Sequence, residues 1–324
     1  MYKHRAWNVT LAIAVACTCL SALVQSEPYP NKPVRILVGA VAGGTTDLMS
    51  RLVTKEFTPL FEQSFVVDDR AGASGIIAAN IMAKSPPDGY TLLMVGSAHS
   101  KIPALYPDVP YDTHKDLACI GLVANTPYVL VVHPSLPVKN VAELIVYLKK
   151  TPGAVYASPG QGTGQHLSAE LFKKMAGVSM SDIHYKGSGA LRTDLLSGRV
   201  PIAFDNVSLM LPYLAHGTLR ALAISAGQRS SLLPDVPTVN ESGLPGFEVL
   251  GWFALLAPAK TPKGRIQIFN RALNEVLARP SLKNSLATSG ATPMGGTPKQ
   301  CDNFIFAEVD KWSKVIKEVG IKLK

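Results

Sequence analysis

The chain has 324 residues, 47% of them hydrophobic and 17% charged, and its formal net charge is +9. This length suits two lobes of ordinary domain size. A positive charge is typical of nucleic-acid-binding proteins, but the basic residues are scattered and form no arginine-rich stripe. The composition therefore argues against a nucleic-acid partner and favours a solvated surface that suits anionic solutes.

Residues 1–26 match the pattern of a secretory signal peptide. Lys3 and Arg5 give a positive start, an apolar stretch follows, and Ser26 fits the small-residue preference of signal peptidase. The polar segment "SEPYPNKP" comes next without a stop-transfer pattern, and neither Cys17 nor Cys19 lies in a good lipoprotein motif. We expect cleavage after Ser26 and a mature protein in the periplasm. No later apolar run approaches the roughly 18–20 residues that span a bilayer.

After the leader, strand and helix signals alternate along the chain. Residues 34–40 and 64–67 are predicted strands, separated by an apolar helical stripe that begins at Leu48. A second helix, 76–84, leads through a Pro-Pro and Asp-Gly turn into a strand at 91–96. Short apolar strands that alternate with helices predict βαβ units and a largely parallel sheet.

A second, smaller α/β block begins at residue 120. Its predicted elements follow the same alternation: strand 120–134, a helix after Asn140, strand 154–159, helix 166–176 before Gly177, strand 182–185, helix 190–198, strand 199–205, helix 207–217 and strand 219–225. We therefore expect the second block to form a lobe of its own.

From Gly227 the composition shifts to proline and glycine. A strand at 250–258 and helices around 263–279 and 298–318 follow. The simplest topology returns the chain to the first lobe. We predict two connections between the lobes, with lobe 1 comprising 27–125 and 228–324 and lobe 2 comprising 126–227.

Two cysteines remain once the leader is removed. An oxidising compartment permits a disulfide between Cys119 and Cys301. Both residues, however, lie in apolar patterns, "DLACIGLV" and "KQCDNFIF". We expect two buried free thiols.

Three turns share one construction, in which a strand ends, glycines follow and a helix begins. They are "AVAGGTTD" (40–47), "DDRAGASG" (68–75) and "SPGQGTGQH" (158–166). A helix N-terminus offers unpaired N–H groups and the positive end of the helix dipole, so it binds anions without a cationic side chain. In a parallel sheet such turns lie at the carboxyl ends of the strands, where ligands bind. Each turn alone also fits an ordinary strand-to-helix connection, but three together favour a cleft that binds carboxylates or other oxyanions.

Signatures of common enzymes are missing. The first turn lacks the Gly-Lys-Ser/Thr ending of a nucleotide phosphate loop, and "GQGTGQ" lacks the dinucleotide spacing. Neither a His-Glu-x-x-His motif nor a Gly-x-Ser-x-Gly elbow occurs. Ser97 and His99 in "VGSAHS" are a weak hydrolase candidate, because no acid nearby orients the histidine. We expect no catalysis and no cofactor.

The histidines are dispersed, so we expect no metal site. His133 and His216 are interpreted as surface or capping residues. His99, His166 and His184 carry more weight, because each adjoins a candidate ligand loop.

Two further strand ends leave alternatives open. Lys186 in "HYKGSGA" either faces the cleft or is solvated at its rim. Asp205 in "FDNVS" either accepts a hydrogen bond from a ligand hydroxyl or amine, or caps the following helix.

The order of these motifs resembles that of a known family, the periplasmic solute receptors of tripartite tricarboxylate transporters, called Bug-type receptors. "YPNKPVRILV" with "AGGTTD" is similar to the family's opening strand and Pro-Gly-Gly-x-x-Asp loop. "VVDDRAGASG" resembles its Glu-Asn-Arg-Pro-Gly-Ala-Gly-Gly segment, and "PPDGYTLL" its Pro-Asp-Gly-Tyr-Thr-Leu-Leu. "SPGQGTGQHLSAELF", "HYKGSGALRTDLLSGRV", "LPDVPTVNESGLPGFE" and "WFALLAPAKTP" continue the match in the same order.

The resemblance implies an α/β, two-lobed periplasmic binding protein fold of type II-like topology, with two crossing strands and a central ligand cleft. In the family, backbone groups of the first two loops hold one carboxylate, and loops of the second lobe hold the far end of the ligand. The implied ligand-binding residues of this chain are Ala42, Gly43, Gly44, Thr45, Asp47, Ala71, Gly72, Ala73, Ser74, Ser97, Thr163, Gly164, His166, Tyr185, Lys186, Gly187 and Asp205.

Four positions depart from the family pattern. Ala42 and Ala71 replace the usual prolines of the first two loops, Ser74 stands where glycine is common, and His184 replaces a frequent proline. These departures leave the ligand's identity open. Asp47 either binds an amino group of the ligand or caps its own helix.

The resemblance also implies a function. We expect a monomeric receptor that captures a di- or tricarboxylate, an acidic amino acid or an aromatic carboxylate and delivers it to a two-component membrane permease. A receptor that feeds a sensor kinase is the first alternative, and a secreted hydrolase is the second.

Overall fold

The computed structural model describes residues 29–106 and 108–319. The predicted signal peptide, residues 1–26, lies outside this part of the chain. The contacts divide the chain between Asn31 and Lys32, and every element below belongs to the unit that begins at Lys32. Within the described residues, no helix combines the length and the apolar character needed to cross a bilayer.

Three parallel strands begin a ten-stranded sheet, in the order β2-β1-β3. They are β1 (Val34–Val38), β2 (Phe65–Asp69) and β3 (Thr91–Gly96). Ile36 of β1 lies opposite Val67 on one side and Leu92 on the other. The predicted parallel βαβ arrangement is therefore confirmed for these three strands. The sheet as a whole is mixed and not largely parallel, because most of its other strand pairings are antiparallel.

Helices α2 (Thr45–Phe61) and α3 (Ile76–Ala83) connect these strands. Helix α2 forms because Met49, Val53 and Phe57 recur every four residues and bury one face. Glu62 ends the helix with a left-handed φ of 52°.

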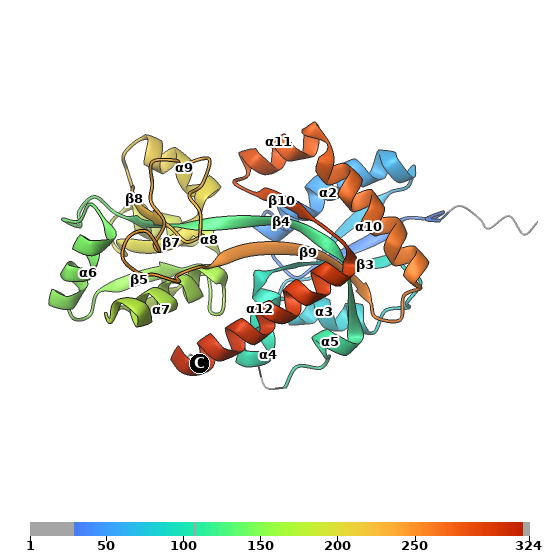
Figure 1. Ribbon diagram of the computed structural model, residues 1–324, viewed down its shortest axis with the longest axis horizontal. Coiled ribbons are helices and arrows are strands. Elements are labelled where there is room, and N and C mark those ends of the chain that lie inside the picture. The colour runs from blue at the N-terminus through green and yellow to red at the C-terminus, as the bar shows by residue number, and fades with distance from the viewer. Residues whose placement is uncertain (1–28, 107, 320–324) are drawn as a thin grey trace, which may run out of the picture. The chain divides into compact units, whose positions relative to one another are not determined.

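Two long antiparallel strands run side by side through the middle of the sheet (Figure 1): β4 (Leu117–Val132) and β9 (Leu250–Pro258). Up to Pro127, β4 pairs with β9, whereas from Tyr128 onward it pairs with β7 and β8. The change of partners marks a division. We call β1–β3, β9, β10 and β4 up to Pro127 the first half of the sheet, and β5–β8 with the rest of β4 the second half.

The second half repeats the strand-helix alternation predicted for it. Its elements are α6 (Val141–Lys150), β5 (Val155–Ser158), α7 (Gly164–Ala176), β6 (Ser181–His184), α8 (Ser188–Leu196), β7 (Ile202–Asn206), α9 (Val207–Ala215) and β8 (Arg220–Ile224). Strand β6 pairs in parallel with β5 and ends the strand order. One apolar cluster lies under α6 and α7, and another lies under α8 and α9.

The segment between β8 and β9 packs with the second half. Val239, Phe247 and Val249 join the cluster under α6 and α7. The backbone N–H of Val249 donates to Ser225 O over 2.9 Å. The chain therefore leaves the second half at the start of β9.

The C-terminal elements return to the first half. They are α10 (Lys263–Ala278), α11 (Pro280–Thr288), β10 (Thr292–Gly295) and α12 (Pro298–Val319), and the short helices α4 (Ile102–Leu105) and α5 (Thr113–Asp116) lie earlier in the chain. Helix α12 contacts both halves, because Ile305 joins the first-half core whereas Trp312 and Ile316 join the second-half cluster.

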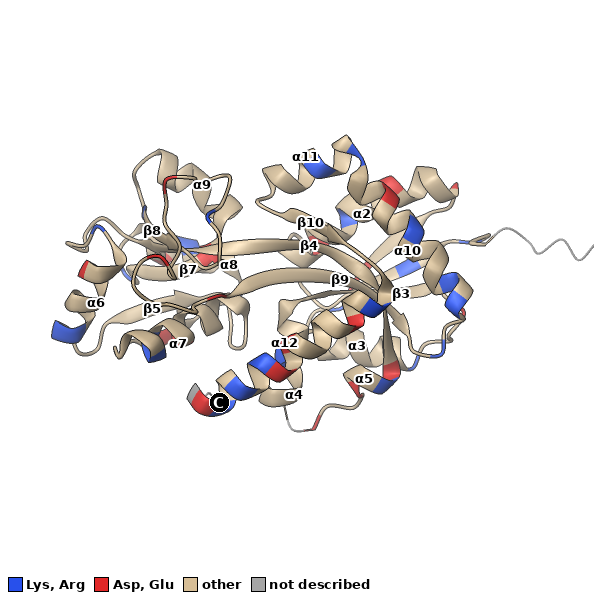
Figure 2. Cartoon of the chain, viewed as in Figure 1, with Lys and Arg blue, Asp and Glu red and all other residues tan. Residues whose placement is uncertain are grey.

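Basic and acidic residues are interspersed over the helices (Figure 2). Many lie in ion pairs, such as Arg279 with Glu56 at 3.2 Å and Lys174 with Glu318 at 2.8 Å. This distribution agrees with the solvated surface expected from the composition.

One expectation was wrong. Cys119 and Cys301 are not free thiols but form a disulfide, with their Cα atoms 5.9 Å apart. The apolar patterns around them place β4 and α12 against the same core, and this contact brings the two residues together. Burial therefore accompanies the bond instead of arguing against it.

Candidate functional site

The first loop ends at an α2 N-terminus that no side chain caps. Gly44 is the N-cap residue and makes no side-chain cap hydrogen bond. Thr45 and Thr46 begin the helix, and the first-turn N–H groups of a helix have no partner within it. The positive end of the dipole and these donors favour an anion at this position.

The Asp47 side chain holds the first loop through a hydrogen bond to its backbone. Its Oδ2 accepts from the Gly43 N–H over 2.8 Å, and its Oδ1 lies 2.7 Å from Arg51 Nε. The residue is 3% exposed. Of the two alternatives for Asp47, this geometry favours the structural one: it anchors the turn before its own helix. The Gly44 N–H also stays inside the loop, where it donates to Val41 O over 3.0 Å.

The second loop has a strained backbone. Four successive residues have positive φ: Gly72 at 135°, Ala73 at 44°, Ser74 at 54° and Gly75 at 96°. A left-handed conformation costs a non-glycine residue on the order of 1 kcal/mol and recurs at ligand clamps.

Two contacts hold this loop in place. Ser74 Oγ lies 2.9 Å from Tyr106 Oη. A Cβ added to Gly39 would lie 2.7 Å from Gly75 Cα, so only glycine at the end of β1 lets loop two approach this closely. Ser74 is thus fixed at the rim of the cavity described next.

Two adjoining cavities lie where these loops meet the second half. The larger, about 240 Å³, is lined in part by Thr46, Ser74, Gly75, His99 and Thr163. The smaller, about 160 Å³, shares Thr46 and Thr163 and adds Thr45, Ser97, Thr126, Tyr128, Gly164, Gln165 and Asn206. Both halves of the sheet therefore contribute to one site, which we call the front site.

Ser97 and His99 are both buried at the front site but are held by different partners. Ser97 hydrogen-bonds to the Tyr128 phenol, and burial raises the pKa of Tyr128 to about 12. His99 Nε2 lies 3.4 Å from Thr113 Oγ1. Burial lowers the pKa of His99 to about 4, so the ring is neutral at neutral pH. These separate contacts describe a binding surface better than a hydrolase dyad.

The third loop leads into a capped helix. Thr163 is the N-cap of α7, and its side chain accepts from the His166 N–H over 3.3 Å. His166 Nδ1 in turn accepts from the Gly162 N–H over 3.2 Å. His166 is buried, which lowers its pKa to about 4. Its ring lies beside Tyr156 and His184 and is absent from the lining of the two cavities.

The remaining predicted residues of the second half do not belong to the lining of either front cavity. Tyr185 donates to Asp194 over 2.7 Å, and Lys186 is exposed. The Gly187 N–H donates to Pro159 O over 3.0 Å.

Asp205 is fully buried. Its Oδ1 accepts from Asn206 N at 2.8 Å, Ser188 Oγ at 3.2 Å and Gln165 Nε2 at 3.5 Å. Its Oδ2 has no partner among the described residues. Burial raises the pKa of Asp205 to about 6. Asp205 holds two residues that line the smaller cavity, Gln165 and Asn206.

The predicted residues thus fall into two groups. Thr45, Ser74, Ser97, Thr163 and Gly164 line the front cavities. The others shape the loops behind them or, like Lys186 and the exposed Ala42, Ala71 and Ala73, face solvent. The lining of the smaller cavity also includes polar residues that were not predicted from the sequence, namely Thr46, Thr126, Tyr128, Gln165 and Asn206. Thr46 and Gln165 directly follow predicted residues, so extending each loop by one residue would have found them.

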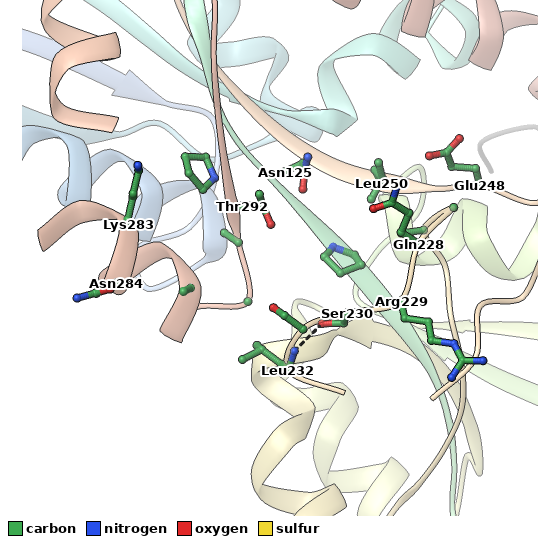
Figure 3. Close-up of a pocket in the computed structure, with 18 residues that line it drawn as sticks. Asn125, Gln228, Arg229, Ser230, Leu232, Glu248, Leu250, Lys283, Asn284 and Thr292 are labelled. Atoms are coloured by element: carbon green, nitrogen blue, oxygen red, sulfur yellow. Dashed lines mark hydrogen bonds between the residues drawn. The ribbon is translucent and has the colours of Figure 1, made fainter. Parts of the chain in front are cut away.

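A larger cavity of about 790 Å³, which we call the rear cavity, is lined by residues of β4, the β8–β9 segment and α11 (Figure 3). Side chains alternate along a strand: Asn125 and Pro127 of β4 line this rear cavity, whereas Thr126 and Tyr128 line the front site. Gln228, Arg229, Lys283 and other residues of the β8–β9 segment and α11 complete its wall. None of the three glycine-rich loops contributes to this lining.

The comparisons with known proteins agree with the loops and the fold. The sequence model of one protein family, the tripartite tricarboxylate transporter family receptor, matches residues 49–321. The chain belongs to this receptor family. Protein BugT of Bordetella pertussis is 38% identical over 317 residues, which is 97% of each chain.

Solved structures of relatives share the fold. Rpa4515 of R. palustris, solved with adipate, has a TM-score of 0.85 and 37% identity and covers 91% of this chain and 100% of its own. MatC of Rhodopseudomonas palustris, solved with bound malate, has a TM-score of 0.80 and 28% identity over 89% of this chain and 100% of its own. The expected α/β periplasmic binding protein fold is therefore confirmed, and the family consists of solute-binding receptors.

Proposed function

We propose that this receptor captures a small organic carboxylate in the periplasm and delivers it to a two-component permease. The observation that carries the proposal is the uncapped N-terminus of α2, whose Thr45 and Thr46 line a site shared by both halves. Relatives solved with adipate and with malate support a carboxylate as the ligand.

One carboxylate group binds the first half. The first-turn N–H groups at Thr45 and Thr46 provide donors, and Ser74 provides a hydroxyl from loop two. Among the residues that the structure describes, no lysine or arginine lines either front cavity. A site built from N–H groups and hydroxyls suits a receptor that must release its solute, because such a site binds the negative charge of the carboxylate without a fixed counter-ion.

The second half recognises the part of the ligand beyond this carboxylate. Thr163, Gln165 and Asn206 present a hydroxyl and two amides, which can donate or accept. The volumes of about 240 and 160 Å³ suit a compact solute. These side chains leave di- and tricarboxylates, acidic amino acids and aromatic carboxylates open.

The two halves act as lobes that close by hinge motion. We place lobe 1 at 27–125 with the C-terminal return and lobe 2 from 126 onward, as the sequence predicted. The packing of Val239 and Phe247 supports extending lobe 2 from 227 to Val249, with hinges near Pro127 and Leu250. A ligand favours closure only through contacts to both lobes at once, and the receptor acts as a monomer without catalysis.

A thermal-shift screen tests the carboxylate. Mature protein is unfolded, freed of bound solute and refolded, then heated with adipate, malate, citrate, acidic amino acids or aromatic carboxylates. A specific ligand raises the midpoint by mass action, and the matching neutral amide, such as adipamide, leaves it unchanged. A shift with neutral sugars and none with any carboxylate would overturn the proposal. Uptake of the identified solute, lost when the receptor is deleted, separates transport from signalling to a sensor kinase.

A further inference from the structure

Three metal-ligating side chains meet at the edge of the second half, outside the front site. His166, Asp182 and His184 each offer one ligand atom, and the three atoms lie within 4.8 Å of one another. We propose that these residues form a binding site for a divalent transition-metal ion of the zinc class.

The fold brings the three residues together from two elements. Asp182 and His184 are two apart on β6, so they point to the same face of the sheet. They lie opposite Tyr156 and Ser158 of β5. His166, in the first turn of α7, covers this face with its ring 4.9 Å from that of His184, edge-on at 75°.

The present contacts hold the ligands close to a binding geometry. His184 Nε2 lies 2.5 Å from Asp182 Oδ2, and His184 Nδ1 lies 2.7 Å from Ser158 Oγ. Metal–ligand bonds of about 2.0–2.2 Å place ligand atoms roughly 3.4 Å apart, so side-chain rotations of about an ångström complete the site. With the metal on Nε2, the Nδ1–H of His184 donates to Ser158, the outer-shell contact that orients metal-bound histidines.

A hydrolase triad is the competing interpretation of Ser158, His184 and Asp182. Ser158 is fully buried, so no substrate reaches its hydroxyl. Asp182 and His184, by contrast, are 37% and 25% exposed in their side chains, which gives a metal ion an entry path.

The donor set selects the metal. Two imidazole nitrogens and one carboxylate oxygen suit Zn²⁺, Co²⁺ or Ni²⁺, whereas Mg²⁺ and Ca²⁺ prefer oxygen ligands. Glu170 lies nearby but is already engaged: it accepts from Tyr156 Oη at 2.6 Å and pairs with Lys173 at 2.7 Å. Water completes the coordination.

Metal binding at His166 is linked to the third loop. The ring now accepts from the Gly162 N–H through Nδ1, and a neutral imidazole has one lone pair. A metal on Nδ1 takes this lone pair, and a metal on Nε2 moves the ring proton to Nδ1. Either way the hydrogen bond to Gly162 is lost, beside the Thr163 that lines the front site.

Calorimetry with the tag-free mature protein, stripped with chelator, tests the site. Zn²⁺ is expected to bind with one-to-one stoichiometry, and Co²⁺ to give the d–d absorption of a site with nitrogen ligands. His184→Ala and Asp182→Asn should each weaken Zn²⁺ binding at least about tenfold. His216→Gln, an exposed histidine outside the cluster, is the matched control and should bind as the wild type does.

Both substitutions lie on an exposed edge strand, and circular dichroism of the metal-free variants verifies their folding. A Zn²⁺ affinity that is unchanged in His184→Ala, or a wild type that binds no Zn²⁺ stoichiometrically, would overturn the proposal. Neither result affects the carboxylate site, whose readout needs no metal.

Discussion

The N-termini of α2 and α7 face the same site but are built differently. Helix α2 has a glycine N-cap and no side-chain cap, and Asp47 holds the preceding loop by accepting from the Gly43 N–H. Helix α7 is capped by Thr163, and its loop is tied to the His166 ring. No side chain of the described residues therefore competes with a ligand for the first-turn N–H groups of α2, whereas Thr163 already accepts from the His166 N–H of α7, and the second half adds the side chains of Gln165 and Asn206 to the cavity lining.

We propose that the first half provides affinity for the carboxylate and that the second half provides specificity for the rest of the ligand. Backbone N–H groups recognise a carboxylate whatever it is attached to. We propose that the side chains of Gln165 and Asn206, which line the smaller cavity, distinguish the rest of the ligand. Relatives with this fold have been solved with adipate and with malate.

The largest expected effect concerns the covalent tie of the first half, since the second half contains no cysteine. Replacing Cys119 and Cys301 together by serine removes a link across 182 positions of the chain. We expect a loss of about 2–5 kcal/mol in the free energy of unfolding, measured by urea denaturation. Reductant should destabilise the wild type similarly and leave the double variant unchanged. Equal stability of the wild type with and without reductant contradicts the assignment.

Gly164→Ala tests how tightly α7 is seated. The added Cβ would lie 2.2 Å from Tyr128 Oη, so the helix or the ring must move. We expect destabilisation by about 1–3 kcal/mol and weaker carboxylate binding, measured by denaturation and calorimetry. Gly189→Ala in α8 is the matched control, because its Cβ meets nothing within 4 Å. If both variants behave alike, the close seating of α7 on Tyr128 is disproved.

Asp205→Asn sharpens the role of the second half through its pH dependence. The folded protein raises the pKa of Asp205 from 3.8 to about 6, so folding favours the protonated form. The protonated Asp205 carboxyl therefore adds to the free energy of unfolding below pH 4, and this contribution is lost as the pH rises through 6. The isosteric amide cannot ionise, so the variant should be more stable than the wild type by roughly 1–3 kcal/mol at pH 7.5 and equal to it near pH 4. If the stability difference between the variant and the wild type does not vary with pH, burial does not raise the pKa of the Asp205 carboxyl.

The smallest effect is expected for Tyr106→Phe. This change removes the hydroxyl that contacts Ser74 in the strained second loop. We expect a loss of about 0.5–1.5 kcal/mol and a modest weakening of carboxylate binding. Tyr147→Phe on α6, away from the front site, provides the control. Wild-type binding by Tyr106→Phe would mean that loop two holds its conformation without this contact.

Much of the fold and the loops could be predicted from the sequence, because strand and helix periods and glycine-rich turns are local signals. The front site itself could be predicted only in part. Tyr128 faces it because β4 crosses between the halves, and no local pattern shows which face of that strand meets α7. Cys119 and Cys301 meet only through the tertiary contact of β4 with α12.

The histidine cluster illustrates the same limit. Asp182 and His184 share a face by strand periodicity, which the sequence shows. His166 joins them only because α7 packs over β5 and β6, so dispersed histidines in the sequence did not indicate a cluster.

The most direct test of the account is carboxylate titration of Thr46→Asp by calorimetry, with a ligand found in the thermal-shift screen. An acid in the first turn of a helix is favourable for the helix, but here it occupies the anion position. The account predicts a folded protein whose carboxylate affinity falls at least about tenfold, or ~1.4 kcal/mol. Asn284→Asp introduces the same charge at the rear cavity and should bind as the wild type does. Undiminished binding by Thr46→Asp would contradict the claim that the α2 N-terminus holds the carboxylate.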